Sequence, residues 1–198
     1  MSKLMNIMAM FVVLLFSSLL PATARAEVAQ PGTYQIDPGH TSAQFQISHL
    51  GFSHLVGRFN QLQGTIVLDP KGKSSVEVTI QANSIDTNHK KRDDHLRGPD
   101  FFNVKQFPVL KFVSDKVTFN DKGEPTEITG KLSLHGKTNP VKLTVKAVGA
   151  GKDPWGGYRA GYDASTTIKR ADYGMNYMPK GLGSDVKIIL NVEAIKKK

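Results

Sequence analysis

The histidines are the residues best suited to metal or acid–base chemistry, and the chain has six of them. His49 and His54 stand five positions apart and His89 and His95 six, so neither pair shares a helical face or matches a zinc motif. Distant strands could still bring His40, His49 and His95 together. The chain has no cysteine, no Gly-x-Ser-x-Gly elbow and no phosphate-binding glycine loop. We therefore expect no catalytic residues, no metal and no cofactor, with a metal-dependent hydrolase built on the histidines as the alternative.

The charged run RDDH at residues 92–95 could also be an acid–base constellation. The simpler interpretation is the solvated face of a short helix, on which neighbouring opposite charges pair. Lys90 with Asp94 and Asp93 with Arg97 both stand at i,i+4. We expect these two ion pairs on the helix surface.

The helix that contains this run must be short. Asp86 or Thr87 can cap its start, and Gly98-Pro99 ends it. Leu96 is its only apolar anchor, so the helix would not be stable in water alone. Phe101-Phe102 follow directly, and we expect them to fix this segment as a lid across a larger structure.

Nearly all of the remaining chain alternates apolar and polar residues with period two, which is typical of strands with one wet face. In the stretch from Ser42 to His49, Phe45, Ile47 and His49 fall on the inner face. His49 is then either a core histidine bonded to a backbone carbonyl or a polar contact for a ligand.

Turn signals interrupt the alternation at several places. We expect a turn or short helix between Gly51 and Gly57, followed by one strand from about Arg58 to Leu68. Other irregular segments are expected at Ser114–Lys116, in the glycine-rich stretch from Gly149 to Gly157, and from Arg170 to Gly183. About eight strands remain. Strands of this length would leave long exposed edges in an open sheet, which favours a closed antiparallel barrel over a two-sheet sandwich.

Residues 1–26 have the features of a cleaved signal peptide. Lys3 precedes an apolar run from Ile7 to Leu20, and Ala24-Arg25-Ala26 has the small-x-small form of a cleavage site, with cleavage after Ala24 or Ala26. An uncleaved anchor is the alternative, although the 14-residue run is shorter than the ~20 residues of a membrane span. We therefore expect residues 27–198 to form a single exported domain in a bacterial periplasm.

The chain is basic, with a formal net charge of +9. The basic residues are spread along it, and Lys196-Lys197-Lys198 is the only tight run. This run is either a solvated tail or a weak attraction to an anionic membrane surface. We expect no nucleic-acid partner, because an exported protein rarely meets one.

An ordered set of short motifs covers almost all of the chain after residue 26. The motifs are Tyr34-Gln35-Ile36-Asp37 with His40, Phe45, Ile47-Ser48-His49, Gly57-Arg58-Phe59, Gly64, Ser84-Ile85-Asp86-Thr87, Arg92-Asp93-Asp94-His95-Leu96, Asp100-Phe101-Phe102, Phe107-Pro108, Gly130-Lys131-Leu132, His135-Gly136 and Arg170-Ala171-Asp172-Tyr173-Gly174. With this set the sequence resembles the YceI-like family of polyisoprenoid-binding proteins.

The resemblance implies an all-β fold, namely an extended eight-stranded antiparallel β-barrel that is lipocalin-like, here with the short helical lid. It also implies a long isoprenoid or similar amphiphilic lipid, of the quinone or prenyl phosphate type, held along the barrel axis. Transport, storage and sequestration in the periplasm are all compatible with such binding, and no enzyme activity is implied. A ligand-free, stress-induced structural protein is a further alternative, and a homodimer is left open.

The expected ligand contacts are the inward apolar side chains of the strands and lid, together with polar residues near the lid. The hydrophobic tunnel is expected to comprise Phe45, Ile47, Leu62, Ile66, Val78, Ile80, Phe101, Phe102, Leu110, Phe112, Leu132, Leu134, Tyr162 and Ile188. The headgroup is expected to meet His49, Arg92 and His95.

Overall fold

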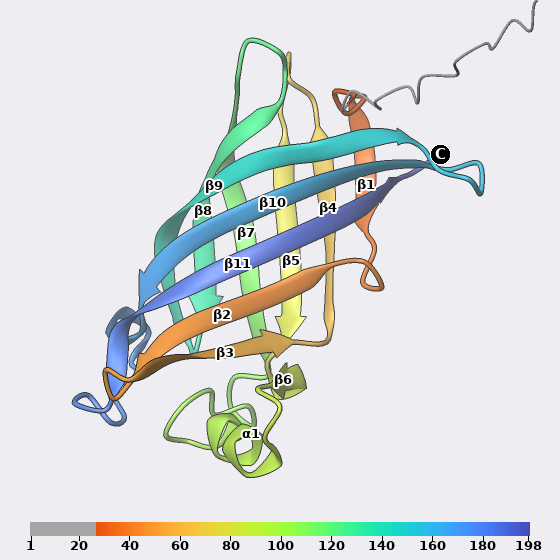
Figure 1. The fold of residues 1–198 in the computed structure, drawn as a ribbon. Coiled ribbons are helices and arrows are strands. Elements are labelled where there is room, and N and C mark those ends of the chain that lie inside the picture. The colour runs from red at the N-terminus through yellow and green to blue at the C-terminus, as the bar shows by residue number, and fades with distance from the viewer. Residues whose placement is uncertain (1–26) are drawn as a thin grey trace, which may run out of the picture.

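The structure is a computed structural model that describes residues 27–198, so the expected signal peptide lies outside the described residues. The described chain folds into one antiparallel sheet with a single α-helix (Figure 1). The strands are β1 (Gly32–Ile36), β2 (Ser42–His49), β3 (Ser53–Phe59), β4 (Leu62–Leu68), β5 (Ser75–Gln81), β6 (Ile85–Asp86), β7 (Val109–Phe119), β8 (Pro125–Leu134), β9 (Lys137–Lys152), β10 (Tyr158–Lys169) and β11 (Leu182–Lys196). The helix is α1 (Lys90–Arg97), and η1 (Ala82–Ser84) and η2 (Arg170–Tyr173) are single 3-10 turns.

Eight of the strands close into a barrel in the order β1-β4-β5-β7-β8-β9-β10-β11, because β1 pairs with both β4 and β11. The prediction of a closed eight-stranded antiparallel barrel is therefore confirmed. Strands β2, β3 and β6 extend the sheet from the other part of β11.

Strands β1 and β2 share one edge of β11. Tyr34 lies opposite Lys196 at the C-terminal part of β11, and His49 lies opposite Leu182 at its start. The turn between β1 and β2 stays attached to β11 through a 2.8 Å hydrogen bond from the Asp37 amide to the Glu193 carbonyl. The two short strands thus act as one long strand with an interruption, and only the β1 part closes the barrel.

The expected strand from Arg58 to Leu68 is wrong in its bounds. The structure has two strands there, β3 and β4, separated at Asn60-Gln61. The expected turn is present at residues 50–52 but does not extend to Gly57, because β3 begins at Ser53. A Cβ atom at Gly57 would collide with the ring of Phe45 on the neighbouring strand, so this glycine permits close packing and does not break the strand. The expected glycine-rich loop is also shorter, because β9 continues to Lys152. The irregularity expected at Ser114–Lys116 is confirmed by a register shift at that point.

The expected helix exists, but its cap and one of its ion pairs differ from the prediction. His89 is the N-cap, and its Nδ1 accepts a 3.2 Å hydrogen bond from the Arg92 amide. The Lys90–Asp94 pair is confirmed at 2.6 Å. The expected Asp93–Arg97 pair is wrong, because Asp93 is buried against the preceding turn and Arg97 pairs with Asp94 at 3.2 Å. The helix therefore presents one carboxylate inward instead of a fully solvated face.

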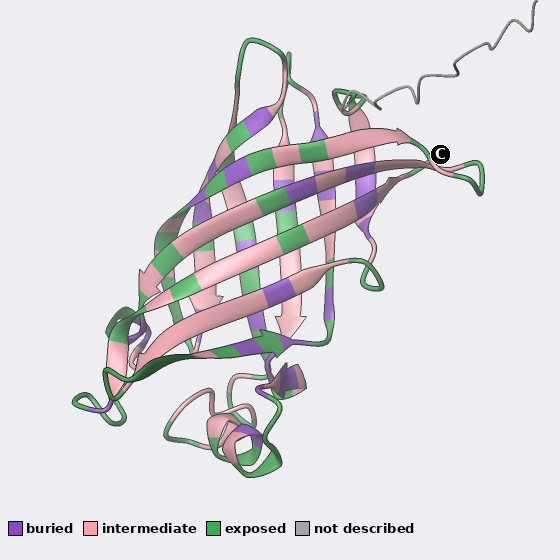
Figure 2. Cartoon of the chain, viewed as in Figure 1, coloured by how far each residue is buried: buried purple, intermediate pink, exposed green. Residues whose placement is uncertain are grey.

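Along β7 and β9 exposed residues alternate with buried or intermediate ones, whereas β2 and β11 consist mainly of intermediate residues (Figure 2). A large cluster of buried residues includes Tyr34, Ile66 and Tyr162. A second cluster, which includes Phe59, Ile85 and Tyr173, lies under the lid segment. Within residues 27–198, no helix has the length and apolar composition that a membrane span requires.

Candidate functional site

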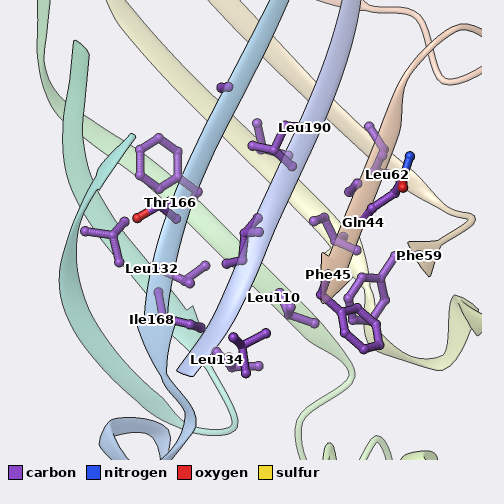
Figure 3. Close-up of a pocket in the computed structure, with 18 of the residues that line it drawn as sticks. Gln44, Phe45, Phe59, Leu62, Leu110, Leu132, Leu134, Thr166, Ile168 and Leu190 are labelled. Atoms are coloured by element: carbon purple, nitrogen blue, oxygen red, sulfur yellow. The ribbon is translucent and has the colours of Figure 1, made fainter. Parts of the chain in front are cut away.

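The barrel contains a cavity of about 690 Å³ that is lined by residues of both apolar clusters. Its wall consists mainly of aliphatic and aromatic side chains that point inward from almost every strand (Figure 3). Leu132, Ile168 and Leu190 lie on one side of the view, and Phe45 and Leu62 on the other. Ligand pockets of proteins commonly have volumes of about 300–1,000 Å³ and mostly apolar walls, which this cavity shares. The interior is therefore not a completely filled core.

All fourteen side chains expected to form the tunnel, and all three expected near the headgroup, line this cavity. Period-two alternation predicted the inward side of the residues that lie in strands, because every strand has one face toward the interior. Arg92, His95, Phe101 and Phe102 line the cavity from the lid segment. For all of these side chains, contact with a ligand stays a prediction.

Part of the wall lies in segments that the sequence did not assign to the site. Residues 53–56 of β3 all line the cavity, although successive residues of a strand normally face opposite sides. This occurs because β3 pairs on its second edge only through Arg58 and Phe59, so the cavity reaches the unpaired edge. Tyr177 and Met178, from the irregular segment after η2, line the same end. The mouth of the cavity is thus between β3, the segment after η2 and the lid.

The lid segment covers this mouth with two phenylalanines that have different neighbours. Phe102 packs edge-on against Phe59, with ring centroids 5.5 Å apart, and belongs to the second core cluster. Phe101 packs against His95 and Tyr177, with centroids 5.1 and 5.2 Å away. Phe102 therefore anchors the lid to the barrel, while Phe101 closes the aromatic rim of the mouth.

The polar residues at the mouth are partly occupied by neighbours on the lid. His95 Nε2 lies 2.8 Å from Asp100 Oδ2, and Arg92 donates from Nε and Nη2 to Thr87 at 2.7 Å each. His49 is half-buried, and its ring makes no hydrogen bond within the described part of the chain. The structure thus does not support the interpretation of His49 as a core histidine bonded to a backbone carbonyl.

Arg170 is a buried cation on the cavity wall that the sequence analysis missed. Its guanidinium donates to the backbone carbonyls of Met175 (2.7 Å), Tyr177 (2.8 Å) and Gly183 (2.9 Å), and burial lowers its pKa. No carboxylate pairs with it among residues 27–198. Arg170 thereby holds the irregular segment after η2 in place at the mouth.

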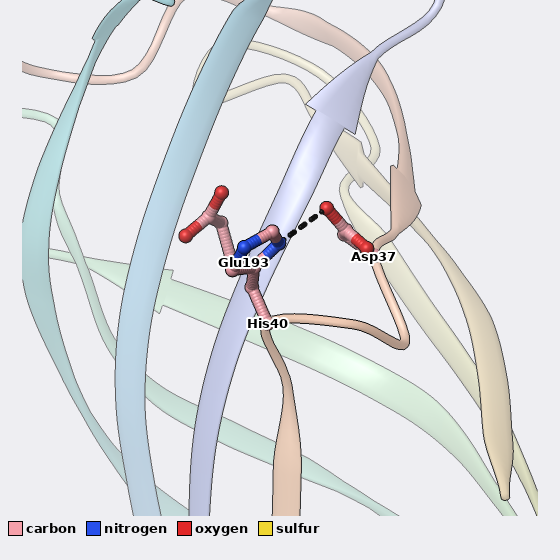
Figure 4. A group of neighbouring side chains, drawn as sticks. All are labelled: Asp37, His40 and Glu193. Carbon is pink, nitrogen blue, oxygen red and sulfur yellow. Dashed lines mark hydrogen bonds and ion pairs between the residues drawn. The ribbon is translucent and has the colours of Figure 1, made fainter.

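Asp37, His40 and Glu193 form the group in the described residues that could hold a metal ion (Figure 4). His40 Nδ1 lies 2.9 Å from Asp37 Oδ2, and the Arg159 guanidinium donates to Asp37 at 2.7 Å and to Glu193 at 2.5 Å. Because Arg159 already pairs with both carboxylates and also with Asp153, the group is best explained as an ion-pair network. It lies at the opposite end of β2 from His49, so His40, His49 and His95 are not brought together.

The deep end of the cavity is rich in tyrosine. Tyr162 lines the wall, and burial raises the pKa of its hydroxyl. Tyr34 is fully buried beside it, and burial likewise raises its pKa, to about 12. Both phenols are therefore neutral at physiological pH, and this end of the cavity has no charge.

A closed eight-stranded barrel with a lidded, mostly apolar interior defines the lipocalin-like class of ligand-binding barrels. Residues 34–194 match the family model described as the YceI-like domain. The chain therefore belongs to the YceI-like family.

Relatives by sequence cover almost the whole chain. A UPF0312 protein of Pseudomonas aeruginosa is 44% identical over 172 residues, which are 85% of this chain and 89% of the relative. Protein YceI of Salmonella agona is 42% identical over 187 residues, which are 92% and 95% of the two chains.

Solved structures show the same barrel. The Campylobacter jejuni YceI protein is 27% identical with a TM-score of 0.65, covering 76% of this chain and 90% of its own. Burkholderia cenocepacia BcnA is 21% identical with a TM-score of 0.70, covering 80% and 98%. A polyisoprenoid binding domain from Saccharophagus degradans is 15% identical with a TM-score of 0.65, covering 85% and 100%. The last two likenesses show the fold alone.

Proposed function

We propose that the protein binds one long amphiphilic lipid, an isoprenoid chain with a small polar head, inside the barrel. The observation that supports this proposal is the apolar cavity of about 690 Å³, which extends from the tyrosine cluster around Tyr34 to the lid. The Saccharophagus neighbour, described as a polyisoprenoid binding domain, has the same fold and supports the same ligand class.

The tail provides most of the affinity in this proposal. Each buried methylene contributes roughly 0.8 kcal/mol, so about 20 buried carbons supply on the order of 16 kcal/mol before the cost of ordering the ligand. A charged head at the mouth stays partly in water, where one ion pair contributes roughly 0–1 kcal/mol. His49, Arg92 and His95 line the mouth and orient the head, while the wall determines how long a tail is accepted.

We further propose that the protein works in a bacterial periplasm after removal of residues 1–26, and that it binds its ligand without transforming it. The apolar run and the Ala24-Arg25-Ala26 site support export. Delivery, storage and sequestration all require the same binding step.

Native mass spectrometry of the protein, purified from the periplasm without delipidation, tests the proposal. We expect a species heavier than the mature chain by the mass of one long-chain lipid, which solvent extraction removes. The same spectrum gives the cleavage position and the number of subunits. Repeated preparations at the mass of the bare chain, which then fail to take up added prenols, would contradict the proposal.

A further inference from the structure

Four exposed apolar side chains gather at the mouth end of the barrel, and we call them the docking tip: Leu50, Phe52, Tyr177 and Met178. Phe52 is 89% exposed, and the other three are about half exposed. Neither Leu50 nor Phe52 lines the cavity, so ligand contact does not account for them. Adjacent exposed apolar side chains of this size usually mark a surface that another phase or molecule covers.

The tip is a fixed structure built from two segments that are far apart in the sequence. The Leu50 amide donates a 2.8 Å hydrogen bond to the Gly181 carbonyl, which ties the β2–β3 turn to the segment before β11. A Cβ atom at Gly181 would lie against both Met178 and Leu50, so these two side chains meet around this glycine. Arg170 holds the Tyr177 carbonyl from the other side at 2.8 Å.

The tip is continuous with the entrance to the cavity. Tyr177 and Met178 are exposed to solvent and also line the cavity wall. The half-exposed Val56, on the unpaired edge of β3, does the same. An apolar surface formed by Tyr177, Met178 and Val56 therefore leads from outside the molecule to the interior.

The charge of the two segments favours one kind of partner. Residues 49–56 and 175–182 contain no aspartate or glutamate, and they include Lys180, His49 and His54. Apolar and aromatic side chains in segments that contain a lysine and no acidic residue suit the interface of a bilayer that contains anionic lipids.

We propose that the docking tip inserts into a lipid bilayer and sets the cavity mouth against it, so that the ligand passes between bilayer and barrel without crossing water. This inference rests on the proposed lipid-binding function. In this proposal the docking tip, and not the lysine tail, contacts the membrane. Lys196-Lys197-Lys198 lies at the other end of β11 (Figure 1). At about 3.3 Å per residue, the 15 residues of β11 separate tail and tip by roughly 45 Å.

The single tryptophan allows a comparison of two proteins, each with one fluorescent reporter at a different end of the barrel. Trp155 is 77% exposed and lies in the β9–β10 turn, at the end of the barrel remote from the tip. The variant Phe52→Trp with Trp155→Phe moves the only tryptophan to the tip. With vesicles of phosphatidylethanolamine and phosphatidylglycerol, we expect the emission of this relocated tryptophan to shift to the blue and to be quenched by lipids brominated in their acyl chains. The native Trp155 should show neither effect.

A second experiment compares two double substitutions with the same chemistry. Leu50→Asp with Phe52→Asp should weaken co-sedimentation with vesicles by roughly tenfold or more, because two side chains lose their burial. Val148→Asp with Trp155→Asp, at the exposed remote end, should leave it unchanged. Binding by insertion should also survive about 1 M salt, at which exposed charges are screened within about 3 Å.

The outcomes separate this inference from the proposed function. If the tip reporter does not respond to vesicles, or both reporters respond equally, docking through the tip is wrong, whatever native mass spectrometry shows of bound lipid. If the tip responds while no preparation ever binds a lipid, the proposed function fails and the tip is a membrane anchor only. In the absence of vesicles, the Leu50→Asp/Phe52→Asp variant should retain its ligand as the native protein does.

Discussion

Thr87 and Asp93 join the strand that enters the lid to the helix that forms it. Both the backbone amide and the hydroxyl of Thr87 donate to Asp93 Oδ1, at 2.9 and 2.5 Å. Arg92 donates in return to the Thr87 hydroxyl and carbonyl at 2.7 Å each. The lid is thus attached to the barrel by a closed polar network as well as by Phe102.

This network predicts a large difference between two adjacent carboxylates. Asp93→Ala leaves two donors of Thr87 without their acceptor in a buried place, so we expect a loss of about 2–3 kcal/mol in the free energy of unfolding. Asp94→Ala removes only exposed, solvent-screened ion pairs and should cost much less. Urea denaturation of both variants measures the difference, and equal losses would show that the Thr87 network adds no stability.

The inward face of β5 allows a test of the cavity as the binding site. Ile80 lines the cavity, whereas its neighbour Thr79 does not and lies opposite Lys111 on the outer face. Ile80→Glu places an unpaired charge in an apolar interior and should abolish lipid retention. Thr79→Glu should leave retention unchanged. Native mass spectra of variants with native circular dichroism decide this, and lipid retained by Ile80→Glu would place the ligand elsewhere.

The two lid phenylalanines should have separable effects. Phe102→Ala removes the contact with Phe59 in the second core cluster and should lower the melting temperature. Phe101→Ala opens the rim formed with His95 and Tyr177, so it should raise the dissociation rate of a bound prenol with little change in melting temperature. Stopped-flow displacement and thermal unfolding measure the two quantities. Faster dissociation in Phe102→Ala alone would reverse these assignments.

The Asp37 network should make stability depend on acid pH. The hydrogen bond from Arg159, followed by that from His40, lowers the pKa of Asp37 to about 2. The folded pKa lies below the unfolded value of about 3.9, so the stabilisation is fully present above about pH 4 and is lost as the pH falls through 2. The destabilisation caused by Asp37→Asn should therefore be largest above pH 4 and shrink toward pH 2 in urea titrations. Asp121→Asn, in the exposed turn before β8, is the control.

Affinity should follow the tail more than the head. A long prenol and its diphosphate should bind the delipidated protein within about tenfold of each other, or ~1.4 kcal/mol, while halving the tail should cost far more. Titration with both series measures this. A short diphosphate that binds more tightly than the long prenol would indicate a site built around the head.

The alternation of apolar residues was sufficient to predict the barrel and the wall of its cavity. Ile66, Val78 and Leu132 face inward because a strand in a closed sheet has only two faces, and one of them excludes water. The same rule failed at β3, where an unpaired edge exposes residues 53–56 to the cavity from the side. No local pattern reveals that a strand lacks its second neighbour.

The polar contacts depended on tertiary structure and could not be inferred from the sequence. The turn before the helix contains Asn88 in a left-handed conformation, with φ of 59°, which moves the N-cap to His89 and directs Asp93 toward Thr87. Arg170 precedes the motif Ala-Asp-Tyr-Gly, and nothing nearby distinguishes it from an exposed cation. Its role depends on carbonyls up to 13 residues later, which meet it only after the chain has turned back into β11.

The pairing of β1 with the C-terminal part of β11 also affects when the molecule can fold. Tyr34 lies opposite Lys196, so the ring cannot close until the ribosome has translated the chain as far as Lys196. At about 5–20 residues per second, β1 waits on the order of ten to thirty seconds for β11, its second partner. We propose that the protein is exported, and during this interval the barrel of the growing polypeptide is still open. Removal of residues 194–198 should therefore leave an open sheet edge prone to aggregation, because β1 would have no strand to meet on that side.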